Sequence, residues 1–234
     1  MAKKVKTNSK IIDAIVETMS ITAKDLLPSF KIAISQYNNN GLAANVWAHR
    51  ADVITGKFQG NEDIKVLHIS RGSLWQFEAI LDQQNNELYI MINENNLHNL
   101  KMKFKKEHFS NHYLYSFLHY NNPYNSSDVQ LELLDDEYKK KNEERRINDC
   151  HKMLADYADK VDKVIVVSFG YVQNIITNGK IDLFDGQYNK VDSIDISNKI
   201  IELNKTPEEK ALGVNKKKKN AVTKPLVKLK VNKK

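Results

Sequence analysis

Apolar residues at helical spacing occupy the first quarter of the chain. Ile11, Ile15 and Met19 fall on one face of a predicted helix, and the same period predicts further helices over residues 22–37 and 42–55. The second of these contains Pro28, which is compatible with a helix only in its first turn. The chain therefore begins with a predicted group of three helices.

The pattern then changes to the two-residue period of strands. Apolar segments at residues 66–69, 75–81 and 87–93 predict three short strands. Turn-forming residues at 82–86 separate the last two strands, which favours an antiparallel meander. Alternate positions within residues 75–81 are apolar, and this is typical of a strand that is buried on one face.

Helical patterns return between residues 94 and 159. An aromatic segment at residues 108–120 predicts a helix that ends before Pro123. A long charged helical stretch follows at residues 129–160, and its part from 135 to 149 is expected to face solvent.

A second group of strands follows. Continuous apolar residues at 163–170 predict a central strand that is buried on both faces. Asn178-Gly179 lies between two apolar segments and predicts a type I′ hairpin, because both central positions of that turn require positive φ. Residues 191–196 predict an edge strand.

This order of elements predicts an α+β fold. Its mainly antiparallel central sheet consists of a three-strand meander plus a later hairpin, with helices packed on one side. The chain divides into a basic N-terminal arm (1–10), a single α+β domain (11–204), a short capped helix (205–213) and a basic disordered tail (214–234). Thr206, Pro207 and Glu209 supply the capping pattern of the short helix.

Basic residues are concentrated at the two ends of the chain. Residues 205–234 hold eleven lysines against two glutamates, a local net charge of +9, and residues 1–10 carry +4. The overall charge is +7, so residues 11–204 carry −6. The pI of about 9.2 therefore describes the ends of the chain, because the predicted domain is mildly acidic.

The single cysteine, Cys150, excludes an intramolecular disulfide and paired-cysteine zinc sites. Residues 1–10 are polar and lack the apolar segment of a secretory signal, and no run of about eighteen apolar residues is present. These features predict a cytoplasmic protein with no membrane partner. No residue pattern predicts a cofactor.

The lysine-rich C-terminal end is the first candidate binding region. Closely spaced lysines bind phosphates by displacing counterions, without sequence preference, although a solubilising tail has the same composition. A second basic region precedes the aromatic segment, whose rings could stack on bases or belong to an ordinary core. The candidate nucleic-acid-binding residues are Lys216, Lys217, Lys218, Lys219, Lys224, Lys228, Lys230, Lys101, Lys103, Lys105 and Lys106.

A group of polar residues around the first predicted sheet is a second candidate site. The chain has only four arginines, and arginine in a lysine-rich chain suggests planar, bidentate recognition of a phosphate or carboxylate. The alternative is a structural salt bridge between Arg71 and either Asp52 or Asp82. The six residues of this predicted polar site are His49, Arg50, Asp52, Arg71, Trp75 and Asp82.

The element order also matches the α-β-β-β-α-β skeleton of restriction-type nucleases. These enzymes hold magnesium with an acid on one strand and a Glu/Asp-x-Lys motif on the next. Asp82 and Glu87 could supply the acids, but the residue two positions after Glu87 is Tyr89, so the motif is absent. His108 and His112 are spaced i, i+4 but have no third ligand in view, so no metal site is predicted.

Four segments resemble an uncharacterised protein family of low-GC Gram-positive bacteria and their phages. They are His49-Arg50-x-Asp52, Arg71-Gly72-x-x-Trp75, Asp82 and His112-Tyr113-x-x-x-Phe117. The resemblance extends over about residues 45–185 and implies no activity and no catalytic residue. It favours an origin in a phage or mobile element, as does the high content of Lys, Asn and Ile, which indicates an AT-rich genome.

These features favour a non-enzymatic, nucleic-acid-associated protein that binds the phosphate backbone through its basic ends. One alternative is a phage or mobile-element protein that modulates a host protein by direct binding. The other is a degenerate restriction-type nuclease-like fold.

Overall fold

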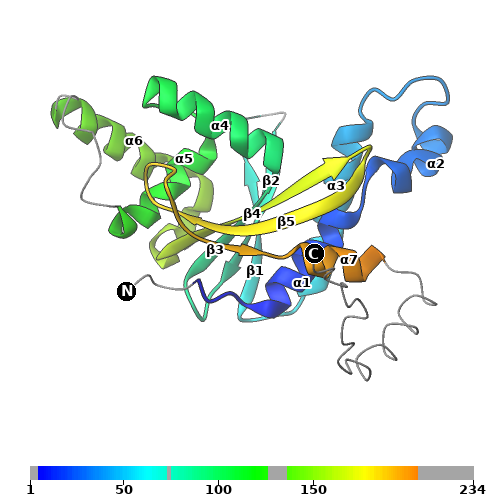
Figure 1. Ribbon diagram of the computed structural model, residues 1–234, viewed down its shortest axis with the longest axis horizontal. Coiled ribbons are helices and arrows are strands. Elements are labelled where there is room, and N and C mark those ends of the chain that lie inside the picture. The colour runs from blue at the N-terminus through cyan, green and yellow to red at the C-terminus, as the bar shows by residue number, and fades with distance from the viewer. Residues whose placement is uncertain (1–4, 73–74, 126–135, 205–234) are drawn as a thin grey trace, which may run out of the picture.

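A six-stranded sheet in the order β1-β2-β3-β4-β5-β6 forms the centre of the protein (Figure 1). All neighbouring strands are antiparallel except β3 and β4, which are parallel. A parallel pair requires a long crossover, and the crossover here contains α4 to η2. The strands are β1 (Ile64–Ser70), β2 (Gln76–Asp82), β3 (Glu87–Asn93), β4 (Lys163–Val172), β5 (Ile175–Phe184) and β6 (Lys190–Asp195).

This computed structural model describes residues 5–72, 75–125 and 136–204. The predicted capped helix at 205–213 and the basic tail at 214–234 lie outside the described residues. Within the described part, the fold is α+β with a mostly antiparallel sheet, as the sequence pattern predicts. No helix in that part is both long and apolar enough to span a bilayer.

Helices cover both faces of the sheet, so the prediction of helices on one side is wrong. One face packs against α1 (Ser9–Ser20), α3 (Leu42–Phe58) and α7 (Ser197–Asn204). The other packs against α4 (Glu94–Glu107), α5 (Tyr113–Phe117), η1 (Leu118–Tyr124), α6 (Asp136–Leu154) and η2 (Ala155–Lys160). The sheet has an apolar core on each face, because adjacent residues of a strand point to opposite faces. In β2, for example, Leu81 lies in one core and Ile80 in the other.

The predicted helices at the N-terminus are correct in position but not in length. In α1, the apolar face of Ile11, Ile15 and Met19 is fully buried, as predicted. The second helix, α2 (Ala23–Ala33), ends earlier than predicted, and Pro28 lies beyond its first turn. Only Phe30 of α2 is buried, since this helix packs on α3 and extends away from the sheet (Figure 1).

The hairpin predicted at Asn178-Gly179 is wrong. Strand β5 runs through both residues, and the chain turns instead at Gln173 and Asn174, whose φ angles are 50° and 62°. The glycine serves packing, because a Cβ atom on Gly179 would lie 3.0–3.1 Å from Ile196, Ile200 and Phe169. It allows β5 to approach α7, which the sequence pattern did not predict.

The helical crossover also differs from its prediction in two places. His108 has a φ of 53° and ends α4, so the aromatic helix begins only at Tyr113. The charged helix α6 is not wholly solvated, because Arg146 is 1% exposed. The Arg146 guanidinium donates to the carbonyls of Tyr115 and Gly186 and to the Glu143 carboxylate.

Candidate functional site

Arg50 of the predicted polar site lies at the C-terminal end of α1. Its guanidinium donates to the carbonyls of Met19 (3.0 Å) and Ile21 (2.9 Å) and to the Tyr171 hydroxyl (3.2 Å). The side chain lies against the rings of Trp47 and Tyr171, and burial lowers its pKa. Cationic donors stabilise the free carbonyls of a helix end, so Arg50 joins α1, α3 and β4.

Asp82 is the last residue of β2, at the start of the turn to β3, and is 1% exposed. Its carboxylate accepts from the side chains of Asn8 (3.0 Å) and Asn85 (2.9 Å) and from two backbone amides of the turn. Glu87 is the cross-strand partner of Asp82 and is paired with Lys163 of β4. The Tyr89 hydroxyl donates to Glu87 at 2.7 Å, so both carboxylates have protein donors.

Arg71 and Trp75 flank the turn between β1 and β2. The Arg71 amide donates to the Trp75 carbonyl at 2.8 Å, which continues the β1–β2 ladder by one position. The Arg71 guanidinium donates to the Asn111 carbonyl at 3.2 Å. No ion pair joins Arg71 to Asp52 or Asp82, both of which belong to the described part of the chain.

The predicted polar site is divided among separate places. Arg71 lies in the turn before β2 and Asp82 ends that strand, whose seven residues span about 20 Å. Asn8, which binds Asp82, caps the start of α1, whereas Arg50 binds its end, twelve residues or about 18 Å away. His49 and Asp52 are exposed on α3. Among these six residues, Arg71 and Trp75 are the two from different segments that are joined by a hydrogen bond.

Sequence reasoning missed a second arginine that binds Asn111, the residue to which the Arg71 guanidinium donates. Arg145 of α6 donates to the Asn111 side chain at 3.5 Å and to the Ser110 carbonyl at 2.9 Å. Its guanidinium carbon also lies 4.8 Å from the Phe109 ring centroid. The scarcity of arginine, which drew attention to Arg50 and Arg71, applies equally to Arg145.

Lysines of α4 and β6 form a basic patch, defined here as Lys101, Lys105 and Lys190. The Lys101 ammonium lies 4.6 Å from the Phe184 ring centroid. Burial lowers the Lys101 pKa, and the charges of Lys190 and Lys105 lower it further against the opposing effect of Asp182. Lysines that lower one another's pKa lie in a region of positive potential, and such a region attracts anions.

Other lysines of the second basic region are exposed. Lys105 and Lys106 face solvent without an ion pair to any described acid. Lys103 is 3.8 Å from Glu107, a surface pair one turn apart. The seven tail lysines of the first candidate region, from Lys216 to Lys230, lie outside the described residues.

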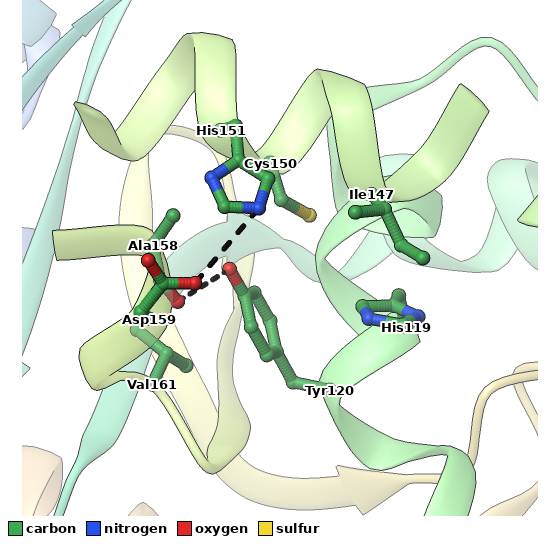
Figure 2. Close-up of a pocket in the computed structure, with 8 residues that line it drawn as sticks. All are labelled: His119, Tyr120, Ile147, Cys150, His151, Ala158, Asp159 and Val161. Carbon is green, nitrogen blue, oxygen red and sulfur yellow. Dashed lines mark hydrogen bonds and ion pairs between the residues drawn. The ribbon is translucent and has the colours of Figure 1, made fainter. Parts of the chain in front are cut away.

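Figure 2 shows a cavity of about 320 Å³ beside η1, α6 and η2, which no sequence pattern indicated. His151 and Cys150 project from α6 toward Tyr120, whose hydroxyl donates to the Ala158 carbonyl at 2.9 Å. The cavity is lined by His119, Tyr120, Ile147, Cys150, His151, Ala158, Asp159 and Val161.

The groups around this cavity are occupied or inert. Cys150 is 1% exposed and donates to the Ser116 carbonyl, and burial raises its pKa to about 12. With this raised pKa, Cys150 is a neutral thiol near pH 7. A nucleophilic or metal-binding cysteine must instead be a thiolate. His119 contacts Glu143, and His151 lies 3.9 Å from Asp159.

His108 and His112 do not share a helical face. His108 ends α4, while His112 caps α5 by accepting from the Leu114 amide at 3.2 Å. Burial, and then the charge of Arg71, lower the His112 pKa to about 4. Among residues 5–72, 75–125 and 136–204, no three or more His, Cys, Asp or Glu side chains form a group that could hold a metal ion.

Comparison with known proteins gives the chain a family. Residues 4–234 match a family of unknown function, DUF5986, and the chain belongs to this family. No curated protein and no solved structure gives a significant match.

Proposed function

We propose that this is a non-enzymatic, nucleic-acid-associated protein of bacterial or phage origin, which binds the phosphate backbone through its basic ends. The observation that carries the proposal is the separation of charge along the chain. The C-terminal 30 residues carry +9 and the first ten carry +4, against −6 for the residues between them. A polyanion gains most by binding such segments, because each neutralised phosphate releases condensed counterions.

The positions where both basic ends leave the described part support the proposal. The Val5 amide donates to Asp192 of β6 at 2.7 Å, so the N-terminal segment begins beside this edge strand. Helix α7 follows β6 directly, and its Lys199 pairs with Asp13 of α1 at 2.6 Å. Both ends therefore start from the same edge of the sheet.

The basic patch borders the same strand from the other face. Lys190 is the first residue of β6 and is the cross-strand partner of Phe184, which belongs to the core beneath α4. The nearby Asp182 is 4% exposed at its side chain and is paired with Lys190. Beside Lys190, the three lysines of the basic patch therefore outnumber Asp182, the one carboxylate that interacts with them.

Binding of a labelled DNA duplex at several salt concentrations tests the proposal. The full chain is compared with a chain that ends at Gly213, because this truncation removes nine lysines and no acid. Five neutralised phosphates would give a slope of about −4.5 in log K against log salt. We expect the truncated chain to bind more weakly and with a shallower slope.

A control at a single surface charge is Lys24→Gln, which removes one exposed lysine from α2. We expect it to leave affinity and slope nearly unchanged. If truncation at Gly213 changes neither quantity, the basic tail is not a nucleic-acid-binding element and the proposal is wrong.

Direct binding to a host protein is a second candidate function, favoured by the apolar surface of α2 and the loop after it. Ile32 is 89% exposed and Tyr37 is 92% exposed. Exposed apolar side chains grouped in this way often mark protein-binding surfaces. An Ile32→Asp, Tyr37→Asp double variant should lose a protein partner captured by the wild-type chain. If nuclease treatment releases the captured protein, nucleic acid and not the α2 surface connects the two proteins.

A further inference from the structure

The side chains of Arg71 and Trp75 lie on the same face of the sheet. Ile69 and Phe77 are cross-strand partners whose side chains enter the core beneath α4, α5 and α6. Arg71 and Trp75 each lie two residues from this pair, and their backbones are hydrogen-bonded. Side chains alternate along strands and directly opposite residues share a face. The two therefore extend the row of Ile69 and Phe77 to the edge of the sheet.

Trp75 has an aromatic surface that the fold does not use. It is 60% exposed, whereas Phe77 in the next position of the same row is 9% exposed. Phe77 stacks on Tyr113 with ring centroids 4.0 Å apart. The row thus begins with a packed aromatic pair and ends with an open indole ring at the surface.

The Arg71 guanidinium has hydrogen-bond donors that no described residue uses. A guanidinium carries five N–H donors, and within residues 5–72, 75–125 and 136–204 one Arg71 nitrogen donates, to the Asn111 carbonyl. Burial and Arg71 hold His112 in its neutral form near pH 7, since its pKa is about 4. Arg71 therefore supplies the positive charge here, in a planar form suited to a phosphate.

Arg145 positions the loop that orients Arg71. It donates to the Ser110 carbonyl and to the Asn111 side chain, and it also pairs with Asp149 at 3.3 Å. Because both of its terminal NH2 groups are engaged by the protein, Arg145 is a positioning residue for Asn111. Four residues lie between Asn111 and the exposed Lys106 near the end of α4.

We infer that this Arg71–Trp75 corner binds an unpaired nucleotide, with the base stacked on Trp75 and the adjacent phosphate on Arg71. An aromatic ring beside a basic group is the usual arrangement for single-stranded nucleic acid. Bases inside a duplex present no open face to such a ring. The inference rests on the proposed function and adds a preference for single strands, which basic tails alone do not provide.

The test compares single-stranded and duplex oligonucleotides on the full chain and its Trp75→Ala variant. Loss of one base–aromatic stack should weaken single-strand binding roughly 5- to 140-fold, with duplex binding changed less than about twofold. Trp75→Phe should restore most of the affinity. Tyr37→Ala removes another exposed ring elsewhere and should have no effect.

Fluorescence gives a second readout that does not depend on affinity. The chain has two tryptophans, so Trp47→Phe leaves Trp75 as the only indole. Single strands of DNA or RNA should quench its emission, and duplex should not. Arg71→Gln should weaken single-strand binding, and Arg71→Lys should restore it only in part, because lysine lacks the planar fork.

The outcomes separate this inference from the proposed function. If the full chain binds duplex and Trp75→Ala leaves single-strand affinity unchanged, the inference is wrong and the proposed function stands. Equal losses for both ligands would also overturn it, because they would indicate a general role in backbone binding. If the full chain binds neither ligand, both proposals fail.

Discussion

The Asn121 carboxamide makes two hydrogen bonds with Val164, donating to its carbonyl at 2.9 Å and accepting from its amide at 2.8 Å. The β4–β5 register ends at the pair of Val166 and Asp182, and its continuation would pair Val164 with Phe184 two positions further on. Asn121 also donates to the Phe184 carbonyl at 2.7 Å. Its side chain therefore lies between β4 and β5 where the two strands separate.

Asn121→Ala should be strongly destabilising. The change leaves three buried backbone groups without a partner, and each such group costs about 1–3 kcal/mol. We expect the free energy of unfolding, measured with urea, to fall by at least about 3 kcal/mol. Asn148→Ala, at an exposed position of α6, should change it by less than about 0.5 kcal/mol. Similar stabilities for the two variants would contradict this account of Asn121.

Arg50→Lys tests whether the planar guanidinium holds the end of α1. Lysine keeps the charge but cannot reach the Met19 carbonyl, the Ile21 carbonyl and the Tyr171 hydroxyl with a fixed fork. We expect a loss of about 2–3 kcal/mol in unfolding free energy, because hydrogen bonds to charged groups contribute most of this amount. His49→Ala is the control on the same helix and should be nearly neutral. A stable Arg50→Lys variant would show that the fork geometry is not required.

Much of the fold could be predicted because strong periodic patterns fix local structure. The buried face of α1 and the continuous apolar strand β4 follow directly from spacing. The errors occurred where tertiary packing decided the outcome. Gly179 belongs to a strand that approaches α7, although its sequence has the form of a turn. A short-range pattern contains no information about that approach.

The candidate site could be predicted only in its parts. Arg71 and Trp75 stand out in the sequence, since one is a rare arginine and the other begins the alternating strand predicted at residues 75–81. Asn111, in the loop before α5, contacts Arg71 across 40 positions, and Arg145 of α6 contacts Asn111 across 34 positions. Such contacts depend on how helices pack on the sheet, which periodicity does not determine.

Alanine substitutions at Gly170 and Gly56 should change the stability of the protein in opposite directions. A Cβ atom on Gly170 would collide with the Asn178 side chain, which also donates to Glu94. Gly170→Ala should therefore destabilise the protein by about 1–3 kcal/mol. Gly56 lies inside α3, where an added methyl group would meet nothing within 4 Å, so Gly56→Ala should stabilise by about 0.5–1 kcal/mol. Thermal unfolding of both variants checks the pair, and a change of the same sign in both would contradict it.

The protein should lose stability at alkaline pH. Burial raises the pKa of Cys150 from 9.0 to about 12 and that of Tyr113 from 10.0 to about 12. Because the folded values are higher, the unfolded chain ionises first, and the stabilising contribution is complete only below the unfolded values. The urea midpoint should fall as pH rises from 9 toward 12. Cys150→Ala should show a smaller decline, whereas a constant midpoint in the wild type would contradict the prediction.

Lys105 and Lys106 provide a test of nucleic-acid contact on the folded domain itself. Both are exposed at the end of α4 and precede the loop that holds Arg71. If each neutralises one phosphate, a Lys105→Gln, Lys106→Gln double variant should reduce the magnitude of the duplex salt slope by about 1.8, or by about 1.4 on a single strand. The matched control is Lys24→Gln together with Lys152→Gln, which removes two exposed lysines from α2 and α6. Equal changes in both double variants would mean that general charge, and not this region of α4, determines binding. No change in the α4 variant, combined with a large loss on truncation at Gly213, would assign backbone binding to the C-terminal segment alone.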